Sequence, residues 1–143
     1  MNQVSSSRAT SVSARLVRLG FGDAARAEQH LADPALAGLV EPLEDVFEDG
    51  LLLDLAQAPD PDLALAGLVR LMAAVRAVQR LDPDDPLVAR ADAAHLLQAI
   101  RVAGPVRHRL FAVLGSSPAL TDHLVRHPAH WAVLLDDEPP SAT

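Results

Sequence analysis

Residues 59–80 read PDPDLALAGLVRLMAAVRAVQR, and this stretch decides the fold. Its apolar residues recur every three or four positions, which is the period of one face of an α-helix. The recurring positions are Leu65, Leu68, Val69, Met72 and Val75. The PDPD run ends the element before it and supplies an Asp cap and a first-turn Pro for the element after it. We therefore predict a helix over 63–80 as the central and most buried helix of the protein.

Start and stop signals for helices also precede this stretch. A short helix is predicted over 11–19, ending at Gly20. Asp23 can cap a second helix, which must stop before Pro34 because proline cannot continue it. The segment that begins with this proline is predicted to form one brief turn of helix.

Two longer helices are predicted on either side of the central one. The first covers 42–56, although Gly50 is unfavourable in its middle. After a turn at 82–86, the second covers 87–102 and ends before Gly104. Its apolar face consists of Ala93, Leu96, Leu97 and Ile100.

Composition places the chain in the all-α class. Its 143 residues suit one domain with a single core. Ala and Leu are abundant and Tyr is absent, which favours helices over sheets. We predict a compact multi-helix bundle over 11–135 with short Pro, Gly and Asp turns, a disordered tail over 1–10, and an acidic, proline-containing tail over 136–143.

Charge and cysteine content exclude several classes of protein. The net charge is −7, and the arginines are spread along the chain, so we predict no nucleic-acid partner. The absence of Cys excludes disulfides and thiolate metal sites. No apolar run is long enough to cross a bilayer and the first residues do not resemble a signal peptide, so we predict a cytoplasmic protein without membrane contact.

The stretch from Pro105 to Trp131 contains a Gly-Ser-Ser turn, four of the six histidines and the single tryptophan. Pro105 is predicted to open a helix whose apolar stripe leaves Arg107 and His108 pointing elsewhere. The stripe consists of Val106, Leu110, Val113 and Leu114. Gly115 occupies the place of a left-handed residue that ends this helix.

The two serines after this glycine have a structural and a functional interpretation. Ser116 or Ser117 can cap the next helix, with Pro118 in its first turn. Amide groups at such a corner can also bind a phosphate, but caps are far commoner. A Gly-Ser pair also begins the signature of nucleotidyltransferases, in which two acids flanking one residue hold Mg²⁺. Here Asp122 is followed two positions later by Leu124, so the acid pair is absent and we predict no catalytic residue.

The histidines raise the question of a metal site. His123 and His127 are four residues apart on one predicted helix face, a spacing that zinc can use. A metal site would need a third ligand, for which His108 and Asp122 are candidates. The proline after His127 leaves the position of the nearby His130 open. Ordinary hydrogen-bonded or surface histidines are the commoner case, and we predict no metal and no bound cofactor in this chain.

Other polar residues near this segment have simpler explanations. Asp122 is spaced to form an ion pair with Arg126 at i and i+4. His30 and His95 are isolated and have no visible catalytic partner. Trp131 can anchor a partner at the surface, but its large apolar area favours burial against the preceding helices.

The pattern RL-x-x-VLGSS-x-x-L-x-DHL-x-x-HP-x-x-W over residues 109–131 resembles a segment near the N-terminus of the bifunctional glutamine synthetase adenylyltransferase/adenylyl-removing enzyme family. The stretches RLVRLGF at 15–21 and APDPDLALAGLVRL at 58–71 are similar to the opening helices of the same family. The motif residues, which we interpret as structural, are Arg109, Leu110, Gly115, Ser116, Ser117, Asp122, His123, His127, Pro128 and Trp131.

The resemblance implies a much longer enzyme with two nucleotidyltransferase domains. One would transfer AMP from ATP to a tyrosine of glutamine synthetase, and the other would remove it by phosphorolysis. ATP and Mg²⁺ are implied for the full-length enzyme, and glutamine synthetase, a PII signalling protein and the missing downstream catalytic domains are implied as partners. Since this sequence lacks the Gly-Ser…Asp-x-Asp signature, the resemblance assigns it to the helical segment before the adenylyl-removing domain, inactive alone.

Two other interpretations stay open at the level of sequence. The chain can be a free-standing helical module that binds a partner protein through an exposed apolar face. It can also be a small metal-binding protein built on His123 and His127.

Overall fold

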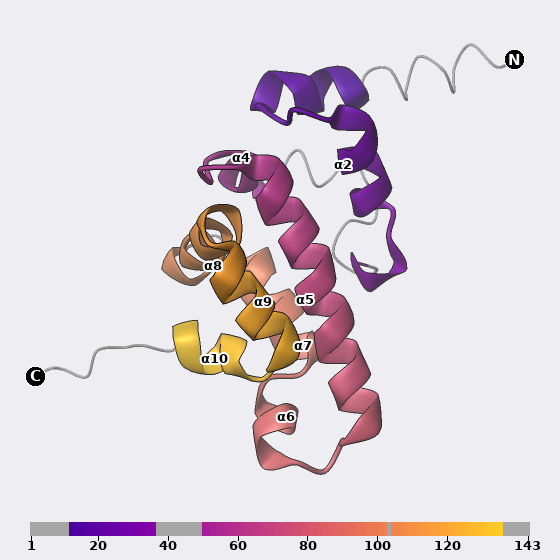
Figure 1. Ribbon diagram of the computed structural model, residues 1–143, viewed down its shortest axis with the longest axis vertical. Coiled ribbons are helices and arrows are strands. Elements are labelled where there is room, and N and C mark those ends of the chain that lie inside the picture. Colours follow the sequence, from indigo (N-terminus) through magenta and orange to yellow (C-terminus); the bar gives the residue numbers. More distant parts are fainter. Residues whose placement is uncertain (1–11, 37–49, 103, 136–143) are drawn as a thin grey trace, which may run out of the picture.

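A computed structural model describes residues 12–36, 50–102 and 104–135 (Figure 1). The predicted tails over 1–10 and 136–143 lie outside these residues. Every regular element in the described part is a helix, which confirms the all-α prediction. The elements are a helix over 12–19, α2 Ala24–Leu31, the 3₁₀ turn η1 Pro34–Leu36, α4 Leu51–Ala56, α5 Pro61–Leu81, α6 Pro86–Arg90, α7 Ala93–Arg101, α8 Pro105–Ser116, α9 Pro118–Arg126 and α10 His130–Leu135.

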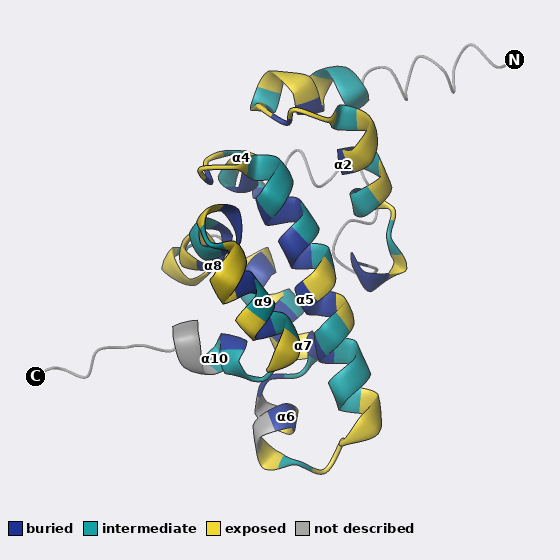
Figure 2. Ribbon diagram, in the orientation of Figure 1, coloured by how far each residue is buried: buried dark blue, intermediate teal, exposed yellow. Residues whose placement is uncertain are grey.

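Helix α5 is the centre of the fold, as predicted. It packs against α2, η1, α4, α7, α8 and α9 (Figure 1). The Asp60 carboxylate accepts a hydrogen bond from the Leu63 amide at 3.1 Å, and Pro61 lies in the first turn. Figure 2 shows that buried residues occupy the first two-thirds of α5, whereas its last turns are more exposed.

The two N-terminal helices follow the predicted punctuation. Gly20 ends the first with a left-handed φ of 115°, and Asp23 caps α2 by accepting from the Arg26 amide at 3.1 Å. The Gly22 amide donates to the Asp62 carboxylate at 2.7 Å, so the turn between these helices is held against the start of α5.

The prediction of a continuous helix over 42–56 is wrong at Gly50. This glycine has φ 77° and ψ 3°, a left-handed conformation, and α4 begins only after it. Residues 42–49 lie outside the described part. Because left-handed backbone suits glycine, Gly50 separates α4 from what precedes it.

The predicted helix over 87–102 is also wrong, because it is two helices. α6 ends at Arg90, and Asp92 caps α7 by accepting from the His95 amide at 3.0 Å. The carbonyl of Ala91 at the break accepts a hydrogen bond from the indole N–H of Trp131 at 2.9 Å. The predicted apolar face of α7 is largely correct, since Ala93, Leu96 and Ile100 are buried.

One property of the helices bears on the prediction that the chain makes no membrane contact. Among the helices of the described residues, none combines the length and the apolar character needed to span a membrane.

Candidate functional site

The segment that resembles the enzyme family forms the corner between α8 and α9. Ser117 alone separates the two helices and has extended backbone angles, φ −133° and ψ 94°. Both helices pack against α5 and against each other (Figure 1). The corner is therefore a tight joint on the central helix.

Gly115 lies inside α8, which corrects the prediction that it ends the helix in a left-handed conformation. A Cβ atom at this position would lie 2.7 Å from the Cβ of Ala58, 3.1 Å from the carbonyl oxygen of Asp60 and 3.2 Å from the Cβ of Ala64. The first distance is shorter than contacts of Cβ atoms allow, and the other two are unusually tight. The glycine is needed because α8 crosses the start of α5 at backbone contact.

The two serines have different roles. Ser117 caps α9, because its hydroxyl accepts from the Leu120 amide at 3.2 Å. The hydroxyl of Ser116 instead donates to the carbonyl of Ala112, one turn back in α8, at 2.6 Å. The predicted capping role is thus confirmed and belongs to Ser117.

Asp122 and Leu124 lie on opposite sides of α9. The Asp122 carboxylate is half-exposed and lies 2.9 Å from the guanidinium of Arg70 on α5. The prediction that Asp122 pairs with Arg126 is therefore wrong, since the packing of α9 on α5 brings Arg70 closer. Leu124 is 1% exposed and belongs to the core. The position where a nucleotidyltransferase would need its second carboxylate is an apolar, inward-facing one.

The three histidines around the end of α9 lie together. The ring centroids of His123 and His127 are 4.9 Å apart, and each lies 5.2 Å from that of His130. The Nε2 of His123 lies 3.1 Å from the Nδ1 of His130, and the rings of His127 and His130 are stacked at 18°. We call these three residues the histidine cluster.

No set of three or more His, Cys, Asp or Glu side chains within the described ranges is arranged to hold a metal ion. The two candidate third ligands do not complete a site. Asp122 is held by Arg70, and His108 is exposed on α8. The absence of a metal in this chain stays a prediction.

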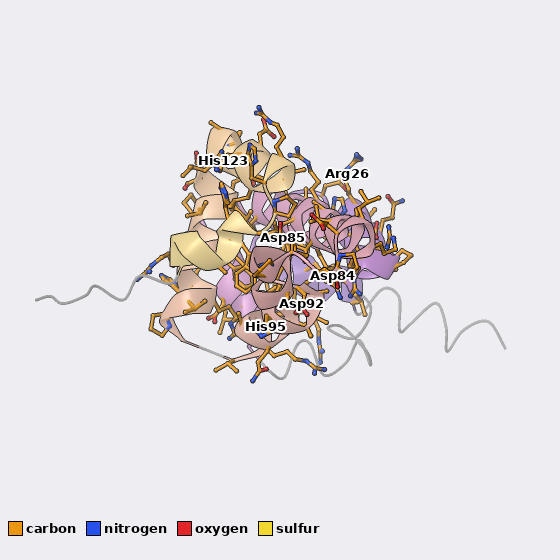
Figure 3. The ribbon with its side chains drawn as sticks, turned by 90° about the horizontal axis from the view of Figure 1, so that it is seen from below. Arg26, Asp84, Asp85, Asp92, His95 and His123 are labelled. Carbon is orange, nitrogen blue, oxygen red and sulfur yellow. The ribbon has the colours of Figure 1, made fainter. Side chains whose placement is uncertain are left out.

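His95 has a partner that the sequence analysis missed. Its Nδ1 lies 2.7 Å from the carboxylate of Asp92, the cap of α7. This side-chain hydrogen bond is the main cause that holds the pKa of Asp92 below its ordinary value, and the amide of His95 adds to the effect. Figure 3 shows this pair at the edge of the molecule opposite His123, so it is separate from the histidine cluster.

Arg107 is the second residue that the sequence analysis missed. Its side chain is 2% exposed, which corrects the prediction that it points away from the buried stripe. The guanidinium donates twice to the carboxylate of Asp54 on α4, once through Nε at 2.8 Å, and donates to the carbonyl of Ile100 at 3.1 Å. This ion pair, in which the arginine is buried and Asp54 is partly exposed, ties α8 to α4 and to the end of α7.

The spacing between Arg107 and the apolar residues of α8 predicts this burial. Arg107 is three, four and seven residues before Leu110, Phe111 and Leu114, all of which are buried. That spacing places Arg107 on the inward face. Val106, which was predicted to belong to the stripe, is exposed.

Trp131 is buried with 5% exposure, as predicted. Pro128 and Leu110 are also buried, whereas Arg109 is exposed on α8. The motif residues thus follow α8, the corner, α9 and α10. Four of them, Leu110, Gly115, Pro128 and Trp131, are buried, and Ser117 caps α9. A purely structural role for all ten motif residues stays a prediction.

Comparison with known proteins identifies relatives of this chain. No family model and no solved structure matches the chain. Bifunctional glutamine synthetase adenylyltransferase/adenylyl-removing enzymes of Streptomyces avermitilis and Streptomyces coelicolor are 42% and 41% identical to it over 133 residues. The same enzyme of Nocardia farcinica is 43% identical over 107 residues.

The coverage of these matches is very unequal. Each Streptomyces match includes 92% of this chain but 11% of the relative, and the Nocardia match includes 73% and 9%. The chain therefore spans about one-tenth of the length of these relatives. At this identity over most of its residues, the chain belongs, as a segment, to the family of bifunctional glutamine synthetase adenylyltransferase/adenylyl-removing enzymes.

Proposed function

We propose that residues 11–135 are a non-catalytic helical domain of a glutamine synthetase adenylyltransferase/adenylyl-removing enzyme, placed before and supporting its adenylyl-removing domain. The observation that carries this proposal is the match of 92% of the chain to 11% of the relatives. The absence of an Asp-x-Asp pair after Gly115 and Ser116 supports a role outside the chemical steps.

The chemistry of the whole enzyme would then belong to other segments. Transfer of an adenylyl group from ATP requires a divalent metal that neutralises the phosphate charge, and paired carboxylates hold such a metal. In this chain one of those positions is the core residue Leu124. We therefore assign ATP and Mg²⁺ to the catalytic segments of the full-length enzyme.

The partners follow from the same assignment. The first partner is the catalytic part of the enzyme, and glutamine synthetase and a PII signalling protein would act on the complete assembly, in the cytoplasm. The helical domain would contribute to control of nitrogen assimilation by keeping its neighbouring catalytic domain in place.

An activity assay tests the non-catalytic assignment. The purified chain is incubated with glutamine synthetase and Mg²⁺, with either ATP or adenylylated target plus phosphate, and AMP on the target is followed. We expect no turnover in either direction. Turnover that disappears in Asp122→Asn, with the helical circular dichroism unchanged, would contradict the proposal.

A complementation assay tests the supporting role. The Streptomyces coelicolor enzyme is prepared without the segment that matches this chain, and its adenylyl-removing rate is measured with and without the chain added. We expect the added chain to raise the rate or the thermal stability of the truncated enzyme. No binding and no rescue, together with a downstream reading frame that does not continue, would favour the free-standing interaction module.

A further inference from the structure

We propose that the histidine cluster of His123, His127 and His130 is a pH-responsive clasp that holds α10 against the rest of the fold and loosens when His123 and His130 are both protonated. The cluster lies at the joint between α9 and α10. This joint is the second of the two helix joints in the family motif. The function proposed above assigns the histidine cluster no role.

The contact between His123 and His130 sets the chemical condition. The two facing nitrogens are 3.1 Å apart, a hydrogen-bond distance. Such a bond needs an N–H on one imidazole and a lone pair on the other, so at least one of the two rings must be neutral. When both rings carry a proton on each nitrogen, two N–H groups face each other and the bond is lost.

Charge repulsion acts in the same direction. The three ring centroids are all within 5.2 Å of one another, so a second proton places two positive charges at close range. His127 stacks on His130 and adds a third titratable ring. Imidazole side chains in general change charge between about pH 5 and pH 8, so this is the range in which we test the clasp.

The charged neighbours do not cancel this repulsion. Asp122 precedes His123, but its carboxylate is bound to Arg70 of α5. Arg126, on the last turn of α9, adds a positive charge beside the cluster. The other charged groups on α8 are His108 and Arg109, which are exposed, and Arg107, which is bound to Asp54. Asp92 is bound to His95 and lies apart from the cluster (Figure 3).

The clasp is coupled to a buried anchor. His130 is the first residue of α10 and directly precedes Trp131. The Trp131 indole is buried and donates to the Ala91 carbonyl at 2.9 Å. Displacement of His130 therefore moves the start of α10 and displaces the adjacent Trp131, whose buried indole holds this helix in the core.

The single tryptophan provides the readout, because the chain has no tyrosine and only one tryptophan. Emission and acrylamide quenching of Trp131 in the full chain are followed from pH 7.5 to pH 5.0 with a chelator present, and far-UV circular dichroism is recorded in parallel. We expect the quenching constant to rise at least twofold and the emission to shift to the red while most helical signal remains.

Two variants test the origin of that response. His123→Gln and His130→Asn keep a polar nitrogen near the position of the imidazole nitrogen but cannot be protonated in this range. We expect each to lose more than half of the pH response. His30→Gln, on α2, is the matched control and should respond like the natural chain. Equal responses in all four proteins would overturn the proposal.

A second measurement does not depend on the variants. Histidine side-chain resonances of the natural chain are titrated by nuclear magnetic resonance. We expect the ring resonances of His123 and His130 to change together with the Trp131 signal. Ring resonances of the cluster that change while the Trp131 signal stays constant would exclude the clasp.

Discussion

The two ends of α9 are joined to their neighbours in different ways. At the α8–α9 corner, one residue connects the helices, a serine caps the new helix, and a Cβ atom on Gly115 would collide with the side chain of Ala58. At the α9–α10 joint, His127, Pro128 and Ala129 connect the helices, three imidazoles lie outside, and one tryptophan lies inside.

The packing of the two joints should therefore be sensitive to different changes. The corner depends on the volume of small residues, because added atoms have no space there. The second joint depends on one large side chain and on the protonation state of its exposed rings. A change of volume should therefore disturb the first joint, and a change of anchor or pH should disturb the second.

The largest expected effect is at the second joint. Trp131→Ala should lower the free energy of unfolding by about 3 to 5 kcal/mol, because it leaves a cavity and removes the hydrogen-bond partner of Ala91. Urea unfolding followed by circular dichroism measures this. Leu81→Ala is the control, since Leu81 is 84% exposed, and should change stability by less than about 0.5 kcal/mol. A loss at Trp131 no larger than the control's would refute the anchor.

Gly115→Ala tests the volume limit at the corner. Alanine is intrinsically better than glycine in a helix by about 1 kcal/mol. Overpacking costs typically about 1 to 3 kcal/mol, and here the clash involves a backbone oxygen and two short side chains, so we expect net destabilisation. Thermal unfolding of the variant measures the sum of the two effects.

Gly67→Ala is the matched comparison for this substitution. A Cβ at position 67 would lie 3.2 Å from a methyl of Thr121 and 3.3 Å from a methyl of Leu114. These are side-chain ends that can shift, so the cost should be smaller than at Gly115 and partly offset by helix propensity. The opposite order of the two variants would show that the close approach at the corner is not limiting.

The serines provide a smaller effect at the same corner. Ser117→Ala should cost about 1 kcal/mol, because it removes the cap of α9. Ser116→Ala should stay within about 0.5 kcal/mol, since this side chain is exposed and caps nothing. Denaturant midpoints of the two variants distinguish the roles, and equal losses would show that both serines support the corner.

The smallest effect concerns the α6–α7 joint, which combines a cap with a histidine. The His95 hydrogen bond lowers the pKa of Asp92, so this carboxylate contributes stability above its ordinary pKa, and the contribution is lost as pH falls through the lowered value. In His95→Ala the pKa of Asp92 should move up toward its ordinary value. Carboxyl carbon resonances titrated from pH 6 to 2 measure this, and an unchanged Asp92 curve would contradict the assigned cause.

Local chemistry was enough to predict most helix starts. Asp23 caps a helix as predicted, the cap predicted in the PDPD run is Asp60, and the cap predicted at the serine pair is Ser117. Such caps are readable because a cap involves only residues two or three positions away. The break at Asp92 was missed, although the same kind of cap occurs there. The Ala91 carbonyl is buried at that break and accepts its hydrogen bond from Trp131, a partner that no local pattern can indicate.

The candidate functional site shows the same difference between features set by neighbouring residues and features set by distant partners. The absence of a catalytic acid pair could be predicted from Asp122 and Leu124 alone. The roles of Gly115 and Arg107 could not be predicted fully, because their partners Ala58 and Asp54 are 57 and 53 positions away in the chain. The inward phase of Arg107 was nevertheless readable from the spacing of its helix.

The hydrogen bond between Trp131 and Ala91 also sets an order of events during synthesis. The two residues are 40 positions apart, and the ribosome makes Ala91 first. At about 5 to 20 residues per second, the Ala91 carbonyl waits about 2 to 8 seconds before its partner is made. During that interval α7, α8 and α9 are themselves being made, so α5 lacks part of its cover. The apolar residues of α5 therefore stay partly uncovered until Trp131 has been made. A chaperone would find the largest apolar surface on the nascent chain during this interval.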